Sequence, residues 1–381
     1  MNQLNKYILF FLFLTLCTAA TSREAEKKKH SSEKALETDG PYLLYTPNNE
    51  LRSITVDKKG KITDKIVPAK DYSFNVSSQN GKHQFAVKLH PIERPQWKYN
   101  QPEKVVVISD PHGNMDCFVS ILQANKVINE KYEWAFGKNH LVIIGDVFDR
   151  GNDVLPIFWL IYKLEKEAAD AGGQLSFLLG NHEPMELIGD ARYAKKKYLN
   201  LAKALNVPYT ELWNKDTELG RWLAVRNTIQ TIGDNLFVHA GLSSELYKWN
   251  KTIPEINETA SLGLFSKKAE RKAISPFTYF VHATYGPLWY RGLVKSEDKY
   301  NPISSDTLNL LLDKYRAKRI YVGHTIFNEV TTFYKRRVIA VNVDNKDNRK
   351  EGRSRGVLIK NDSVFTIFDS GKDKFFFKTS H

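Results

Sequence analysis

The sequence predicts an α/β fold in which several strands carry polar residues to a common edge of a β-sheet. Three short apolar runs support this prediction: Val105–Ser109, Leu141–Ile144 and Leu175–Leu179. Each run ends in a glycine-containing polar segment, a pattern typical of a buried strand that leads into a loop. The segments between the runs have helix-like patterns. The strands should therefore be parallel neighbours whose carboxyl ends lie at one edge.

The polar segments after these runs carry carboxylate, imidazole and amide side chains. They are Asp110-Pro-His112-Gly-Asn114, Gly145-Asp146-Val-Phe-Asp149-Arg150-Gly151 and Gly180-Asn181-His182-Glu183. Two later β-type runs also end in a histidine, at His239 and His324. Because parallel strands place such residues at one edge, a metal site is the first expectation.

Five helical segments are expected around these strands. Capping residues, apolar spacing and glycine breaks place them at about 114–130, 152–171, 184–205, 210–225 and 305–316. Residues 243–300 show no clear periodicity and are expected to be irregular. The C-terminal part should be rich in short strands, with apolar runs at 330–334, 338–343, 356–359 and 364–368.

The first twenty residues resemble a secretory signal peptide. Lys6 precedes an apolar core from Tyr7 to Leu16, and small residues up to Ala20 suit a cleavage site. The core is too short to cross a membrane comfortably, so no stable span is expected after cleavage. Lipid attachment at Cys17 stays open as an alternative, although the bulky Leu16 disfavours it. The protein is expected to be exported, to a periplasm or out of the cell.

Two further regions precede the main domain. Residues 21–39 are charged and poor in apolar side chains, which is typical of a linker. Residues 40–100 contain short β-type runs and an Asn80-Gly81 dipeptide, a strong hairpin signal, and should form a small β extension. The main domain is expected to span residues 101–372.

The net charge and the distribution of basic residues indicate which kinds of molecule the chain could bind. The formal charge of +13 falls to +12 without residues 1–20, which contain one Lys and no acidic residue. This balance favours anionic partners. The basic residues are spread along the chain with no aromatic-interleaved stripe, so nucleic-acid binding is not expected. Two Cys residues are too few for a disulfide framework. The oligomeric state cannot be inferred from these features.

The ligand types and their spacing suit a centre for two divalent metal ions. Such a pair, roughly 3.5–4 Å apart, can activate a shared water and neutralise the charge of a phosphoryl group during ester hydrolysis. The first ion would be held by Asp110, His112 and Asp146. The second would be held by Asp146, Asn181, His239 and His324. This mixture of oxygen and imidazole ligands suits Mn, Fe or Zn.

Other polar residues fit roles beside the metals. His182 could protonate the leaving alkoxide, and Asp149 could orient that imidazole. Arg150 and Arg291 could bind phosphate oxygens, and Asn181 could contact the substrate as well as a metal. Glu183 is expected to support the ligands or to provide a negative charge at a helix start.

Together, the five motifs identify a resemblance to a family. Ser109-Asp-Pro-His-Gly113, Gly145 to Gly151, Gly180 to Glu183, His239-Ala-Gly241 and Gly323-His-Thr325 resemble those of the calcineurin-like metallophosphoesterases. Within them the chain looks like the phosphoprotein phosphatase branch, especially its bacterial Shewanella-like members. The resemblance covers about residues 104–345. It implies two packed mixed sheets flanked by helices (an αββα sandwich), a dinuclear metal site and the residue roles given above.

Three departures from the family pattern leave the expected metal ligands in place. Ser109 replaces a Gly and should be tolerated beside the ligands. Leu179 and Ala240, in place of an Arg and a Gly, affect the expected substrate.

The predicted function is hydrolysis of phosphomonoesters by attack of a metal-bridging hydroxide. The phosphorylated substrate is expected to be a phosphotyrosine or phosphoserine/threonine protein or a small molecule. One alternative is hydrolysis of a phosphoanhydride such as a dinucleotide polyphosphate. Another is a non-catalytic module that binds metal and phosphate.

Overall fold

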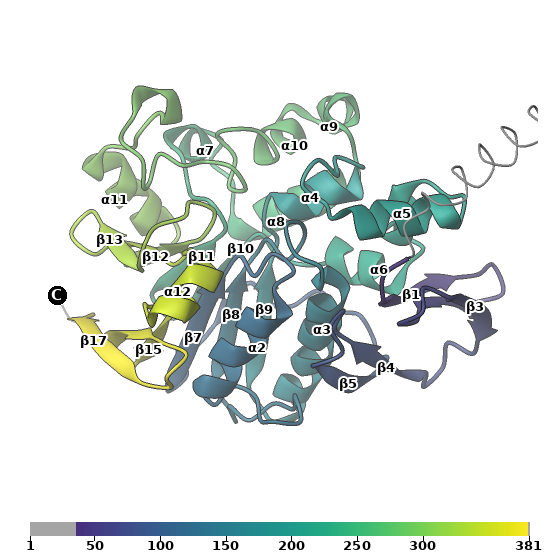
Figure 1. Ribbon diagram of the computed structural model, residues 1–381. Coiled ribbons are helices and arrows are strands. Elements are labelled where there is room, and N and C mark those ends of the chain that lie inside the picture. Colours follow the sequence, from purple (N-terminus) through teal and green to yellow (C-terminus); the bar gives the residue numbers. More distant parts are fainter. Residues whose placement is uncertain (1–35, 380–381) are drawn as a thin grey trace, which may run out of the picture.

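The computed structural model describes residues 36–379 (Figure 1). The predicted signal peptide and most of the predicted linker lie outside the described residues, so the signal and the export remain predictions. Within residues 36–379, every helix is too short or too polar to cross a membrane.

The first of two six-stranded sheets contains the three strands that lead into the polar segments. Its order is β17-β16-β15-β7-β8-β9, and β8 pairs in parallel with both β7 and β9. These three strands are the apolar runs predicted to be parallel neighbours, and that prediction is confirmed. The bounds are β7 (Lys104–Ser109), β8 (His140–Ile144), β9 (Gln174–Leu178), β15 (Gly356–Lys360), β16 (Ser363–Ile367) and β17 (Asp373–Lys378).

The second sheet brings the two later histidines. Its order is β13-β14-β12-β11-β10-β6, and β11 and β12 are parallel neighbours. His239 directly follows β11 and His324 follows β12 after one residue, so both lie at the same edge. The bounds are β6 (Lys98–Tyr99), β10 (Ile229–Ile232), β11 (Asn235–Val238), β12 (Arg319–Val322), β13 (Thr331–Phe333) and β14 (Val338–Ala340).

Three clusters of buried side chains define four layers. Val105, Val107 and Val142 of the first sheet share a cluster with Phe237 and Tyr321 of the second, so the two sheets pack face to face. The opposite side chains of the first sheet pack with helices α2 (Met115–Ala124) and α3 (Val154–Asp170). Those of the second sheet pack with the helices of residues 244–314. The αββα sandwich is therefore confirmed.

The ends of several predicted helices were wrong. Helix α2 stops at Ala124 rather than near Glu130, because the Asn125 side chain donates to the carbonyls of Ile121 and Phe368 at 2.8 and 3.2 Å and Lys126 then adopts a positive φ of 56°. The predicted helices at 184–205 and 210–225 are each divided. Their parts are α4 (His182–Leu187), α5 (Lys196–Ala204), the 3-10 helix η1 (Tyr209–Leu212) and α6 (Glu218–Ala224).

The expectation that residues 243–300 are irregular was wrong. Helices α7, α9 and α10 of this segment have five to seven residues, too few to show a clear apolar period. Helix α8 has 11 residues and begins at a complete capping box between Thr252 and Glu255, a signal that does not depend on an apolar period. The helix predicted at 305–316 is confirmed as α11. The bounds are α7 (Ser244–Lys248), α8 (Ile253–Gly263), α9 (Lys268–Ile274), α10 (Pro276–Val281), η2 (Asp298–Tyr300), α11 (Ser305–Lys314) and α12 (Asn345–Glu351).

The N-terminal β extension forms two small sheets that pack against the main domain beside α3, at the opposite end of the molecule from β17 (Figure 1). Tyr42 is 2% exposed, belongs to the same buried cluster as α2 and α3, and contacts Trp213 edge-on. The indole of Trp159 donates to the Pro41 carbonyl at 3.0 Å. The strands are β1 (Asp39–Tyr45), β2 (Leu51–Val56), β3 (Ile62–Val67), β4 (Ser73–Ser77) and β5 (Gln84–Lys88).

Because the extension shares the core of the main domain, a cavity in it should destabilise the whole chain. We expect Tyr42→Ala to lower the free energy of unfolding by about 3–5 kcal/mol, since a large buried ring is lost. Ile66→Ala, on the exposed strand β3, should change it by no more than about 0.5 kcal/mol. Urea denaturation followed by tryptophan fluorescence would measure both. Equal effects of the two variants would show that the extension does not contribute to that core.

Candidate metal centre

Five chain segments from both sheets meet where their strands end. Asp110, Asp146 and Asn181 follow the parallel strands β7, β8 and β9, while His239 and His324 follow β11 and β12 of the second sheet. Because the sheets pack face to face, the two sets of side chains share one edge. The structure thus brings together every metal ligand predicted from the sequence.

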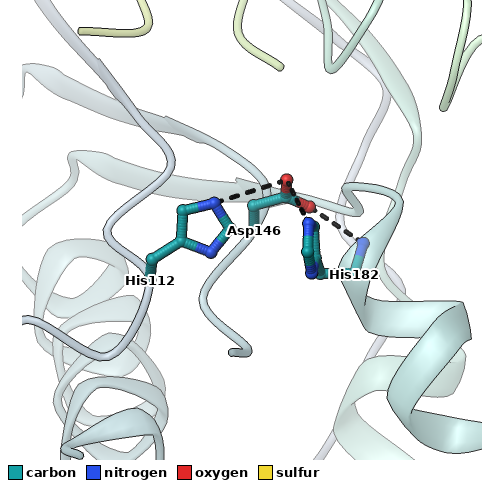
Figure 2. A group of neighbouring side chains, drawn as sticks. All are labelled: His112, Asp146 and His182. Atoms are coloured by element: carbon teal, nitrogen blue, oxygen red, sulfur yellow. Dashed lines mark hydrogen bonds and ion pairs between the residues drawn. The ribbon is translucent and has the colours of Figure 1, made fainter. Parts of the chain in front are cut away.

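Asp146 lies at the centre of this group. Its Oδ2 is 3.2 Å from His239 Nε2, 3.9 Å from His112 Nε2 and 3.8 Å from His182 Nε2. Figure 2 shows His112 and His182 on opposite sides of the carboxylate, with the His182 backbone N–H donating to Oδ1 at 3.0 Å. Among the described residues, Asp146 belongs to both groups of side chains spaced to hold an ion: Asp146 with His112 and His182, and Asp146 with His239 and His324.

Two of the imidazoles are held by Nδ1 so that Nε2 faces the other candidate metal ligands. His112 Nδ1 is 2.8 Å from the Phe148 carbonyl, and His239 Nδ1 is 2.9 Å from the Ile144 carbonyl. A carbonyl only accepts, so each Nδ1 carries a proton and each Nε2 is the nitrogen turned toward the site. Such a bond on the far nitrogen is the usual support of a metal-binding histidine. Burial also lowers the pKa of His112 to about 4, which favours the neutral form that binds metal.

His239 Nε2 lies 3.0 Å from Asn181 Oδ1 and 3.2 Å from Asp146 Oδ2. Burial opposes the imidazolium of His239, but the Asp146 carboxylate outweighs it and raises the pKa of His239 to about 9, so a metal ion bound there would displace a proton.

Asp110 occupies the other side of the site. Its Oδ2 is 4.0 Å from His112 Nε2 and accepts from Asn342 Nδ2 at 2.8 Å, while its Oδ1 accepts from the His324 backbone N–H at 3.2 Å and from the Ser109 hydroxyl. Asn342 had not been recognised in the sequence. It comes two residues after β14, so the rule that polar residues follow strand ends could have found it.

The charge and the unpartnered atoms of the site fit divalent cations. Burial, together with the nearby charge of Asp146, raises the pKa of Asp110 to about 6, because two carboxylates lie close together away from water. His324 Nε2 is buried and has no hydrogen-bond partner. Cations between these groups would offset the repulsion and would complete the coordination of the imidazole, so the donor set fits the predicted ions.

Two glycines allow the strand ends to approach each other. A Cβ on Gly180 would lie 2.1 Å from Asp146 Oδ1 and 2.6 Å from the Asp146 backbone nitrogen. Gly145 has a positive φ of 72°, and a Cβ there would lie 2.7 Å from His239 Nδ1.

The carboxylate of Glu183, at the start of α4, accepts from the backbone N–H groups of Asp146, Val147 and Gly180 at 3.1, 2.9 and 2.6 Å. These contacts fix the backbone beneath the ligands.

The backbone at the site is itself unusual. Many of the predicted site residues have positive φ, a conformation that side chains disfavour and that occurs often at functional sites. Sequence patterns do not indicate this feature, because none of these residues is a glycine. They are Asp110 (49°), His112 (41°), Asp146 (56°), Asp149 (73°), Arg150 (63°) and His324 (61°).

His182 and Asp149 form a buried pair beside Asp146. His182 Nδ1 is hydrogen-bonded to Asp149 Oδ2, and the two residues are 4% and 1% exposed. The other ring nitrogen, Nε2, faces the Asp146 carboxylate. Burial opposes the charged imidazolium, but the carboxylates of Asp146 and Asp149 outweigh it and raise the pKa of His182 above its ordinary value. A proton on Nε2 is therefore directed at the edge of the two sheets where the candidate metal ligands meet.

The two predicted phosphate arginines lie in different surroundings. Arg150 is exposed, lines a cavity of about 390 Å³ with Asp110, His112 and Lys195, and has its guanidinium carbon 5.8 Å from the centre of the Tyr193 ring. Arg291 lies outside the lining of this cavity. Its Nη1 donates to Thr325 Oγ1 at 2.8 Å, next to His324. Tyr193 and Lys195 had not been recognised in the sequence, because their segment carries no strand-end signal.

Comparison with known proteins agrees with this geometry. The model of the calcineurin-like phosphoesterase family matches residues 103–327, more than half of the chain. An uncharacterized protein of Schizosaccharomyces pombe is 32% identical over 265 residues, covering 66% of this chain and 76% of that protein. Shewanella-like protein phosphatase 1 of Plasmodium berghei is 28% identical over 264 residues, covering 65% of this chain and 71% of that protein.

Solved structures give the same result. The cold-active protein-tyrosine phosphatase of a psychrophilic Shewanella species superposes with a TM-score of 0.80 at 30% identity, covering 89% of this chain and 99% of that chain. The resemblance found in the motifs is confirmed, and the family implies divalent metal ions. The chain belongs to the calcineurin-like phosphoesterase family and is a hydrolase of phosphoric esters.

Proposed function

We propose that this phosphatase hydrolyses phosphomonoesters on proteins at a centre of two divalent metal ions. The observation that carries the proposal is the position of Asp146, whose carboxylate belongs to both groups of metal-spaced side chains. One ion would be held by His112 and Asp146 of the first group with Asp110 in place of His182, and the other by Asp146, Asn181, His239 and His324. A phosphoprotein substrate is supported by relatives named as protein phosphatases and by the similar structure described as a protein-tyrosine phosphatase.

The chain's own residues supply the remaining chemistry. When bound, two such ions activate a water molecule and polarise the phosphoryl group. His182 gives the proton on Nε2 to the departing alcohol or phenol, and Asp149 holds the proton on Nδ1 so that the imidazole keeps this orientation. Arg150 presents its guanidinium in the cavity beside the ligands, where it binds phosphate oxygens. Arg291 holds the His324–Thr325 segment through its bond to Thr325, and its positive charge lies near the carboxylates of Asp110 and Asp146.

Removal of the metals should abolish turnover. We expect the purified chain to hydrolyse para-nitrophenyl phosphate, to lose activity and bound metal after dialysis against a chelator, and to recover both on addition of Mn²⁺. Elemental analysis of the active protein should give two ions per chain and would show whether Mn, Fe or Zn is bound. A metal-loaded, folded sample without turnover on any phosphoester would contradict the proposal.

Loss of the proton donor should slow the chemistry without loss of the metals. His182→Ala should lower kcat by roughly 10²–10⁴-fold, as expected for removal of a general acid, while metal content stays unchanged. His90→Gln, a change far along the chain at a half-buried histidine that bonds the Pro91 and Tyr162 carbonyls, should retain full activity. Wild-type kcat in His182→Ala would remove this residue as the acid.

The substrate class requires a direct comparison. Phosphotyrosine and phosphoserine peptides should have higher kcat/KM than a dinucleotide polyphosphate, because the neighbours named in the comparisons are protein phosphatases. The opposite order, measured by phosphate release at equal substrate concentrations, would favour phosphoanhydride hydrolysis instead.

Export is a separate proposal that depends on residues 1–20. Mass spectrometry of the protein from its native cell would then find a new N-terminus near residue 21.

A further inference from the structure

Helix α4 places a second acidic residue next to the His182–Asp149 pair. His182 and Glu186 are four residues apart in α4 (His182–Leu187), so their side chains lie on the same face of the helix. Asp149 faces both of them. One carboxylate oxygen of Asp149 bonds the imidazole, and the Asp149 carboxylate lies near enough to the Glu186 carboxyl group to raise its pKa. All three side chains are buried, and Glu186 is 0% exposed.

The hydrogen bonds of the two carboxyl groups leave one atom of each without a partner. Asp149 Oδ2 bonds His182 Nδ1, while Asp149 Oδ1 is buried and unpartnered. Glu186 Oε2 accepts from the Tyr209 hydroxyl, while Glu186 Oε1 is buried and unpartnered. Two ionised carboxylates in this position would repel each other, and both free oxygens would lack a donor. A single proton between them satisfies both atoms.

The surroundings place that proton on Glu186. Burial, followed by the contact with Asp149, raises the pKa of Glu186 to about 9, and the Asp190 carboxylate acts in the same direction. The other titratable groups that face Glu186 are the phenols of Tyr209 on η1 and Tyr198 on α5. Asp149 has the His182 imidazole as its partner. Because Tyr209 donates to Oε2, the proton of Glu186 is left on Oε1, and the buried Asp149 Oδ1 is a nearby acceptor without a partner.

We propose that Glu186 is a positioning residue for the reaction, which holds Asp149 in place for His182 by donating a hydrogen bond from its protonated carboxyl group. The inference rests on the proposed function of His182 as the proton donor. The bond fixes the plane of the Asp149 carboxylate, so that Oδ2 stays aligned with His182 Nδ1.

Two substitutions test whether Glu186 acts through a donated hydrogen bond, as proposed, or through an ionised carboxylate. Glu186→Gln keeps a donor for Asp149 Oδ1 and an acceptor for the Tyr209 hydroxyl, so kcat should stay within about threefold of wild type. Glu186→Leu has a similar volume but neither group. Its kcat should fall roughly 10–100-fold, the usual loss when a supporting hydrogen bond to a catalytic residue is removed. KM and metal content should be unchanged, because substrate and metal contacts remain.

The pH dependence provides a readout that a purely structural role would not move. Without the donated bond, Asp149 holds more charge and stabilises the imidazolium, so the pKa of His182 rises. The alkaline limb of kcat against pH, where the acid loses its proton, should therefore move to higher pH in Glu186→Leu and stay in place in Glu186→Gln. The imidazole of His182, followed by NMR in the metal-loaded protein, should show the same shift without any need for turnover.

A double-mutant cycle tests whether Glu186 acts through Asp149. In an Asp149→Asn background, Glu186→Leu should cause little further loss of kcat, because the carboxylate that it supports is already absent. Additive losses would overturn the proposal. So would wild-type kcat and an unmoved alkaline limb in Glu186→Leu, or equal impairment of the Gln and Leu variants, which would show that an ionised carboxylate is needed. A wild-type protein without turnover would instead contradict the proposed function, and the NMR shift would still decide the role of Glu186.

Discussion

The buried carboxylate of Asp146 is the group on which the rest of the site depends. It follows β8, the strand between β7 and β9, so it is next to the polar segments of both neighbours. The second sheet packs over the same edge and adds His239, whose Nε2 is 3.2 Å away. A buried charge is tolerated only when it is paired and hydrogen-bonded. Histidines, backbone N–H groups and, in the proposal, two cations surround Asp146 for this reason.

Helix α4 supports the site through two buried glutamates with opposite roles. Glu183 accepts from the backbone N–H groups of Asp146, Val147 and Gly180, and so holds the strand ends together from below. In our proposal Glu186 instead donates, to Asp149. The difference arises from what each residue faces: Glu183 faces peptide N–H groups, whereas Glu186 faces another carboxylate. The same short helix thereby supports both the residues proposed as metal ligands and the proposed proton donor.

Much of the fold and of the site could be predicted because the signals are local. Each apolar run that leads into a glycine and a carboxylate, amide or imidazole marks a strand end by itself, so Asp110, Asp146, Asn181, His239 and His324 could be identified. The helices were less accurate. Most of those in residues 243–300 are too short for a periodic pattern, and Asn125 ends α2 early through a bond to the distant Phe368 carbonyl. Such ends depend on contacts outside the segment.

The sequence alone determined the chemical types, the order and the strand-end positions of the ligands, because these depend on residues that are close along the chain. Only the tertiary structure decided which groups support them. Asn342 donates to Asp110 across 232 residues, and Asp149 raises the pKa of Glu186, which lies 37 residues further along the chain, with no periodic pattern linking either pair. The packing of Tyr42 against Trp213 is similarly distant. Contacts of this kind arise from the way the two sheets and α4 pack, and packing depends on the shape of the whole chain.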